Sequence, residues 1–212
     1  MSNKMNETII FREYQKADHF ALAEIIRKTW HYDQLCSLKT ARKLAASYLD
    51  HCLTDQTFTQ VAVADGIPVG IIMGKNNQTH KCPLRLQLRL MRSTFALFCS
   101  REGREISRMF SRVEKIDADL LKSSPLEYQG EVAFFAINAQ YRGMGLGGKL
   151  FQALQDYMRQ ENIHTFFLFT DTTCNYPFYE HQGMVRRGEH SHNFEVQGPL
   201  GKQTLFIYDY QM

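Results

Sequence analysis

The spacing of apolar residues in the N-terminal half predicts a strand, two helices and a hairpin. Residues 8–14 alternate apolar and polar positions as in a strand, and Asp18 is placed to cap a following helix with inward residues Phe20, Leu22, Ile25, Ile26 and Trp30. Ser37 precedes a second helix, whose stripe comprises Leu38, Ala41, Leu44, Ala45, Tyr48, Leu49 and Cys52. The apolar runs 58–64 and 67–74, joined by Asp65-Gly66, predict an antiparallel hairpin.

An insert of two amphipathic helices is expected at 79–128. The first helix lies around 84–98, the chain breaks at Glu102-Gly103, and the second helix carries the register Ile106, Met109, Phe110, Val113, Ile116 and Leu120. Between 84 and 115 there are eight Lys and Arg against three Glu. These charges are most simply the solvated faces of the two helices, or alternatively a docking surface for an acidic substrate, a cofactor phosphate or a partner subunit.

The C-terminal half begins with a near-continuous apolar run at 131–138, typical of a central strand covered on both faces. A glycine-rich segment, 143–148, opens a helix with inward residues Leu150, Phe151, Leu154, Tyr157 and Met158. A buried strand at 165–170 follows. A short helix at 176–181 is closed by Gly183, and two last strands are expected at about 184–194 and 203–211.

Composition indicates one ordinary soluble domain over residues 1–212, with 44% apolar and 22% charged residues. A net charge of +3, from 25 basic and 22 acidic residues, is too balanced to favour nucleic acid as a partner. Five scattered cysteines lack the spacing of a metal site and indicate reduced thiols and no metal. Without an export signal or a run of about 20 apolar residues, we expect a cytoplasmic protein with no membrane association.

The strand–glycine–helix segment predicts a phosphate site, because unpaired N–H groups and the helix dipole favour an anion there. A glycine turn used only for tight packing is the alternative. Gly143, Gly145 and Gly148 fit a dinucleotide fingerprint, but only 64 residues follow. Gly143, Gly148 and Lys149 fit a nucleotide P-loop, but Leu150 stands where a hydroxyl should bind magnesium. A third interpretation includes Arg142.

The pattern Arg142-x-x-Gly145-x-Gly147 resembles the pyrophosphate loop of the GNAT superfamily of acyl-CoA-dependent N-acyltransferases. The segment from Asn175 through Phe178-Tyr179-Glu180 to Gly183-Met184 resembles that family's next motif. The resemblance implies an α/β (α+β) fold with a mixed, mostly antiparallel sheet of about seven strands, splayed central strands and helices on both faces. Ala139 departs from the proline common in the family, and the insert is longer than usual.

The resemblance also implies direct transfer of an acetyl group from acetyl-CoA to a primary amine. The pantetheine arm would enter between 131–138 and 165–170, pair with backbone there and bond Asn175. The implied cofactor-binding residues are Phe135, Ala136, Ile137, Arg142, Gly143, Met144, Gly145, Leu146, Gly147, Gly148, Lys149, Asn175 and Tyr179. The acceptor would be a small-molecule or peptide amine, and a homodimer is possible. A non-catalytic acyl-CoA sensor and a P-loop nucleotide-binding protein are the alternative functions.

Two side chains are expected to carry the chemistry. Glu131, at the start of the central strand, would accept the proton of the amine; the alternative is a solvated carboxylate at a strand end. By the resemblance Tyr179 would protonate the leaving thiolate, unless it only packs beside Phe178. Acylation of Cys174 is a less favoured route because no histidine marks its activation. His190 and His192 could line the acceptor site or be solvated loop residues.

Overall fold

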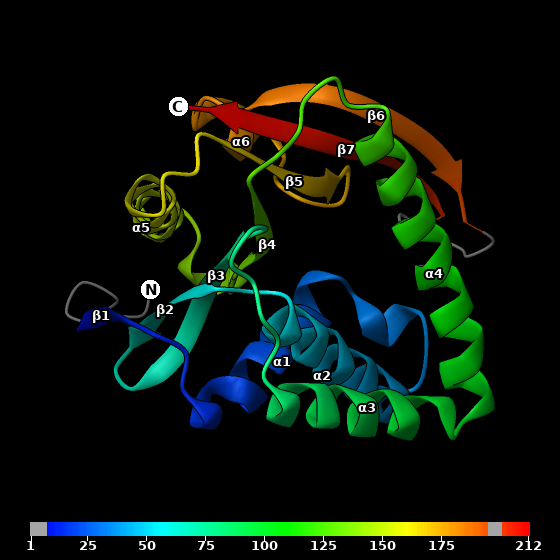
Figure 1. Cartoon of the computed structure of the whole chain (residues 1–212). Coiled ribbons are helices and arrows are strands. Elements are labelled where there is room, and N and C mark those ends of the chain that lie inside the picture. Colours follow the sequence, from blue (N-terminus) through cyan, green and yellow to red (C-terminus); the bar gives the residue numbers. More distant parts are fainter. Residues whose placement is uncertain (1–7, 195–200) are drawn as a thin grey trace.

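The computed structural model describes residues 8–194 and 201–212. Its centre is a seven-stranded sheet in the order β1-β2-β3-β4-β5-β7-β6 (Figure 1). The strands are β1 (Ile9–Arg12), β2 (Phe58–Ala64), β3 (Ile67–Asn76), β4 (Gly130–Ile137), β5 (Thr165–Asp171), β6 (Val185–Asn193) and β7 (Lys202–Gln211). Only β4 and β5 pair in parallel, and every other neighbouring pair is antiparallel. The predicted fold class is therefore confirmed.

Helices cover both faces of the sheet. On one face lie α1 (His19–Thr29) and α2 (Leu38–Thr54), whose apolar stripes form one core with β3 and β4. On the other face lies α5 (Leu146–Gln160), which forms a second core with β5 and β7 (Figure 1). Shorter elements are the 3₁₀ turns η2 (Lys16–Asp18), η3 (Tyr32–Gln34) and η4 (Ala139–Tyr141) and the helix α6 (Pro177–His181).

A bulge in β4 changes which face its side chains occupy. Val132 pairs with Gly74 and Phe134 with Met73, so Ala133 is the extra residue. Val132 consequently packs in the α5 core, whereas Phe134, two residues later, packs in the α1–α2 core. In an undisturbed strand these two side chains would share a face.

The N-terminal predictions hold with three corrections. The hairpin turns at Asp65 and Gly66, which both have positive φ, and Ser37 caps α2 through the Thr40 N–H. Asp18 does not cap α1 with its side chain, because both carboxylate oxygens accept hydrogen bonds from Arg12 at 2.7 Å. Phe20 and Leu38, expected to point inward, are exposed because each lies in the first turn of its helix, at the rim of the core.

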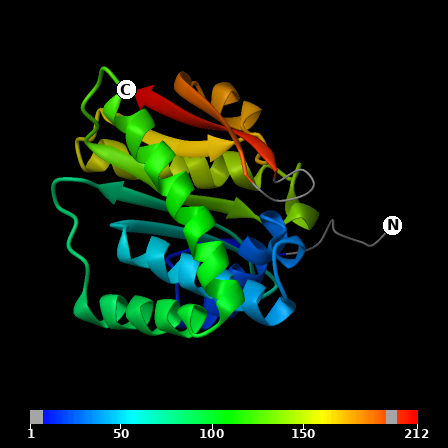
Figure 2. The ribbon, with the colours of Figure 1, turned by 90° about the vertical axis from the view of Figure 1, so that its right-hand side faces the viewer.

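The insert forms α3 (Leu84–Phe98) and α4 (Arg101–Lys122), but the break lies at 99–100 rather than at Glu102-Gly103. Ser100 caps α4 by accepting the Gly103 N–H at 3.0 Å. Gly103 lies inside α4, and glycine is needed there because a Cβ would stand 2.0 Å from the Leu97 carbonyl oxygen. The glycine thus marks a close helix–helix corner and not a helix end. From this corner α4 runs along one edge of the molecule from α3 to β6 and β7 (Figure 2).

Candidate active site

The glycine-rich loop connects β4, through η4, to the N-terminus of α5. Gly143 and Gly145 have φ values of +79° and +77°, a conformation that favours glycine, and a Cβ at either would meet no atom within 4 Å. Leu146, Gly147 and Gly148 are the first residues of α5, so their N–H groups have no partner within the helix. Unpartnered donors at the start of a helix fit an anionic group such as a diphosphate.

The positions of the other expected cofactor-binding residues are as follows. Arg142 and Met144 are exposed beside the glycines. The Lys149 ammonium lies 5.8 Å from the centre of the Phe11 ring, toward β1. Asn175 is exposed two residues before α6, and its carbonyl accepts the Phe178 N–H. Their contacts with a cofactor remain predictions.

The two central strands separate beside this loop. β4 and β5 are paired only at Gly130 with Phe166 and Glu131 with Phe167. Beyond Glu131 the residues Phe135, Ala136 and Ile137 pair with β3 alone, so their other edge borders the gap. A gap between two strands that carry free backbone groups fits an extended amide-containing chain such as pantetheine.

Tyr179 is brought to this gap by α6. Its ring centre lies 6.4 Å from that of Phe135, and its hydroxyl donates to no group within the described residues. Burial, assisted by Cys174 and Asp171, raises the pKa of Tyr179 well above its ordinary value. The phenol therefore keeps its proton at neutral pH and is available as a donor.

Glu131 occupies the last paired position of β4 before the gap. The Lys75 ammonium lies 3.9 Å from its Oε2 and 2.5 Å from Oδ1 of Asp55. Burial raises the pKa of Glu131 to about 7; Lys75 opposes this shift and Asp55 adds to it. A carboxyl that titrates near neutral pH is suited to accept a proton from a substrate.

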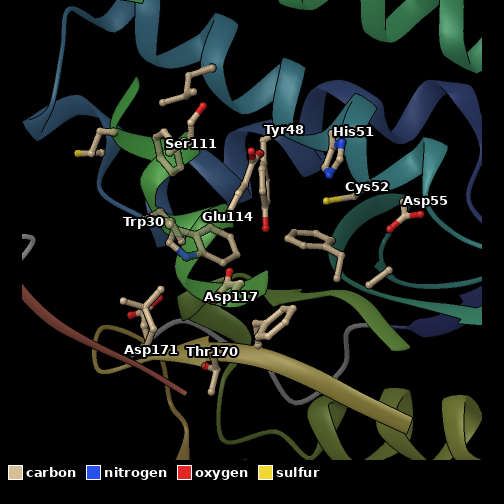
Figure 3. A pocket seen from close by; sticks show the side chains of 18 of the residues that line it. Trp30, Tyr48, His51, Cys52, Asp55, Ser111, Glu114, Asp117, Thr170 and Asp171 are labelled. Atoms are coloured by element: carbon tan, nitrogen blue, oxygen red, sulfur yellow. The ribbon is translucent and has the colours of Figure 1, made fainter. Parts of the chain in front are cut away.

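A cavity of about 690 Å³ adjoins both residues, on the sheet face covered by α1 and α2. It is lined from α2, α3, α4, β4 and β5, and Figure 3 shows Ser111, Glu114 and Asp117 of α4 at the cavity. This volume suits a small-molecule site. The cavity reaches Glu131 on β4 and Tyr179 on α6, so the two expected catalytic residues border one space.

Sequence reasoning did not identify the α4 residues that line this cavity. Glu114 and Asp117 line it from α4, together with Phe110, Val113 and Leu121. No Lys or Arg is among the described lining residues, so the basic side chains of the insert are not what this helix presents to the cavity. Asp117 stands four residues from both Val113 and Leu121, and a charged residue within an apolar stripe was the available signal.

The remaining candidates lie in settings without activation. Burial raises the pKa of the Cys174 thiol to about 12, which disfavours a nucleophilic thiolate. His190 and His192 stack on β6 with ring centres 6.2 Å apart, and neither lines the cavity.

Over residues 8–194 and 201–212 no group of three or more His, Cys, Asp or Glu could hold a metal ion. None of the helices described there has the length and apolar character to cross a bilayer.

Comparisons with known proteins agree with this geometry. Residues 114–184, from α4 through α6, match the sequence model of the Acetyltransferase (GNAT) family. No curated protein sequence matches the chain. The matched segment takes in the glycine loop, β5 and α6, so the chain is similar to this family in the part that forms the candidate cofactor site.

Three solved structures illustrate the shared fold. An agmatine N-acetyltransferase has a TM-score of 0.59 at 11% identity, with 96% of this chain and 99% of that chain covered. The ribosomal-protein-alanine N-acetyltransferase from Brucella melitensis gives 0.56 at 14%, with the same coverage. The ribosomal-protein-S18-alanine N-acetyltransferase from Escherichia coli gives 0.52 at 11%, with 96% and 94% covered. At these identities the likeness is one of fold.

Proposed function

We propose that the protein transfers an acetyl group from acetyl-CoA directly to a primary amine. One observation carries the proposal: Glu131 lies where β4 and β5 separate and lines a cavity with further carboxylates, while the glycine-rich loop follows the far end of the same strand. The three similar structures are all named as N-acetyltransferases, of agmatine or of ribosomal-protein alanine, which supports the same reaction class.

Binding would divide between backbone and side chains. The amides of 143–148 and the Arg142 guanidinium would hold the diphosphate, and the free edge of β4 at Phe135, Ala136 and Ile137 would pair with the pantetheine amides. Acetyl-CoA supplies an acetyl group activated as a thioester. The acceptor would enter from the opposite side, through the cavity walled by α2 and α4.

Glu131 would make the amine nucleophilic. An alkylammonium has a pKa near ~10 and its nitrogen carries no free electron pair, so one proton must leave before attack. Glu131 accepts that proton, directly or through water. The nitrogen then forms a bond to the thioester carbon, and the bond between carbon and sulfur breaks with its electrons left on sulfur.

Tyr179 would complete the proton balance by donating its phenolic proton to the departing sulfur. Its raised pKa keeps the proton in place until a strong base such as a thiolate forms beside it. Negative charge on the carbonyl oxygen would be stabilised by a backbone N–H of β4 at the gap. The nitrogen still carries an extra proton after attack; this proton passes to the Tyr179 phenolate, directly or through water, and the proton on Glu131 is released to solvent. The products are the neutral N-acetylated amine and CoA.

The test combines acetyl-CoA binding with release of CoA thiol in the presence of an amine panel. We expect acetyl-CoA to bind and thiol to appear only when an amine is present, with N-acetylated product confirmed by mass spectrometry. Binding without turnover of any amine would instead indicate an acyl-CoA sensor. Magnesium-dependent ATP binding in preference to acetyl-CoA would overturn the proposal in favour of a nucleotide site.

A further inference from the structure

The charges around the cavity are unequal between its two ends. Five carboxylates line it: Asp55 on the α2 side, Glu114 and Asp117 on α4, Glu131 on β4 and Asp171 on β5. A histidine and a lysine lie near them, His51 on α2 and Lys75 on β3. Lys75 lies between Asp55 and Glu131, so the Glu131 end already holds a positive charge. In Figure 3, His51 and Asp55 lie at the opposite end of the cavity from Asp171.

The other end has no cation among the described residues. Neither Glu114 nor Asp117 forms an ion pair there, and Oδ1 of Asp117 is buried with no hydrogen-bond partner. Asp171 accepts the backbone N–H of Thr173 at 2.6 Å, a neutral donor. A buried carboxylate oxygen without a donor is costly, and its usual complement is a cation. Burial and the carboxylates of Asp171, Glu131 and Glu114 raise the pKa of Asp117 to about 7, as expected where no counter-charge is present.

Aromatic side chains connect the two ends. Trp30, Tyr48 and Phe134 lie with ring centres 5.8 to 6.0 Å apart and line the cavity. Figure 3 shows Trp30 and Tyr48 beside Asp117. Ring faces pack against methylene groups and attract an ammonium group. The lining therefore suits an aliphatic chain that ends in a positive charge.

We propose that the acceptor is a linear aliphatic diamine or polyamine. One amino group loses its proton to Glu131 and is acetylated, while a second, still protonated nitrogen is held by Asp117 and Asp171. The inference rests on the proposed function and adds the charge of the part of the acceptor that does not react. An acceptor with a carboxylate in that place would be repelled by the carboxylates of Glu114, Asp117 and Asp171.

The first test compares three four-carbon amines: 1,4-diaminobutane, n-butylamine and 4-aminobutyrate. They share a primary amine and differ at the far end, which is positive, neutral or negative. A charge-assisted hydrogen bond contributes about 1.5–3 kcal/mol, so we expect kcat/KM to be about 10- to 100-fold higher for the diamine than for butylamine. The aminobutyrate is expected to be the poorest.

The second test removes the unpaired carboxylate. Asp117→Asn is expected to lower kcat/KM for 1,4-diaminobutane by about 10-fold or more while that for n-butylamine stays within about twofold. Asp119→Asn is the matched control, since Asp119 is on the same helix but exposed, and should change neither value. If Asp117→Asn lowers kcat/KM for both amines by the same factor, the same comparison is made with Asp171→Asn. Circular dichroism then checks that each variant is folded.

The outcomes separate this inference from the proposed function. The inference that a second ammonium group is bound would be wrong if kcat/KM were equal for the diamine and butylamine. It would also be wrong if Asp117→Asn and Asp171→Asn each lowered kcat/KM equally for both amines. Either result would leave the proposed acetyl transfer unchanged. An alanine-initiated peptide turned over faster than every diamine would also overturn it. Failure of acetyl-CoA to bind would instead remove the proposed function and this inference with it.

Discussion

The two faces of the sheet contribute different groups to the candidate site: backbone N–H groups on one face and side chains on the other. On the α5 side, donors are backbone N–H groups presented by one continuous segment, from β4 through the glycine loop into α5. On the α1–α2 side, the cavity is made by side chains from α2, α4, β4 and β5, which are far apart in sequence. The first half leaves a signature in glycine spacing, and the second has no contiguous signature.

This difference explains why the acceptor side can vary while the fold stays the same. Backbone donors depend on φ and ψ, so few sequences can form the loop around Gly143 and Gly145. A cavity wall such as α4 can change its lining residues without altering the sheet. The proposed charge selection by Glu114 and Asp117 would thus depend on side chains of α4 and not on the backbone of the glycine loop.

The largest effect is expected at Glu131, where the two halves meet. Glu131→Gln should lower kcat by about 100-fold or more at pH 7, because it removes the proton acceptor. In the parent enzyme the pKa of Glu131, raised to about 7, should make the rate rise as pH passes upward through 7. The variant should lack this rise and recover toward pH 10, where the amine is already unprotonated. Steady-state thiol release across pH measures both.

Glu127→Gln is the control for this variant, since Glu127 is exposed four residues earlier. Its pH profile should match that of the parent. The groups around Glu131 in the cavity and beside it are Lys75, Asp55, His51, Asp117 and Asp171, and none is altered in either variant. A Glu131→Gln enzyme with an unchanged profile would remove this residue as the base.

Tyr179→Phe should have the next largest effect, a fall in kcat of about 10- to 100-fold with acetyl-CoA affinity unchanged. The Tyr179 hydroxyl has no partner among the described residues, so its removal should not change the free energy of unfolding. Tyr157→Phe is the opposite case, because its hydroxyl bonds Thr57 at 2.6 Å. That variant should lose about 1 kcal/mol of stability and keep its kcat. Loss of affinity alone in Tyr179→Phe would contradict the acid role.

The same contrast shows what the sequence could and could not predict. Alternation and helical period gave the order of the elements, and Asp65-Gly66 gave the hairpin, because these signals are local. The break between the two helices of the insert was predicted at Glu102-Gly103 but lies at 99–100, because Gly103 allows close contact with Leu97 and does not end a helix. The bulge at Ala133 depends on pairing with β3, so no local pattern encodes it. For Asp117 the sequence showed only a charge within an apolar stripe, because the residues that complete the cavity around it are distant in sequence.

On the backbone side, Gly145→Ala should raise the Kd of acetyl-CoA by about 10-fold. The residue has positive φ, which costs a side-chain-bearing residue about 1–2 kcal/mol, and relaxing that strain would turn the N–H groups of the loop. Gly66→Ala is the matched control, because Gly66 has φ of +81° and also meets no atom within 4 Å. Both variants should lose similar stability, but only Gly145→Ala should weaken binding in calorimetric titration. Equal Kd values would show that the loop is not the phosphate site.

The smallest effect is on the acceptor side and concerns stability in the absence of ligand. The pKa of Asp117 is raised from 3.8 to about 7, so between these values the folded chain holds a proton that the unfolded chain has released. Stability from this group therefore falls as pH rises from about 4 to 7.

Asp117→Asn should remove that loss and be more stable than the parent by about 1–2 kcal/mol at pH 8, a few degrees in Tm, with no difference near pH 4. This expected stability difference is smaller than the full pKa shift of Asp117 would give, because water reaches part of the side chain. Asp119→Asn should match the parent at both pH values. Thermal unfolding measures the difference, and adding 1,4-diaminobutane at pH 8 should stabilise the parent more than the variant, since only the parent has the charge that the second ammonium would neutralise. If the difference in stability between the parent and Asp117→Asn were the same at pH 4 and pH 8, the carboxylate of Asp117 would already have a partner in the folded chain. The cavity would then have no unpaired negative charge to set it apart from the glycine-loop side.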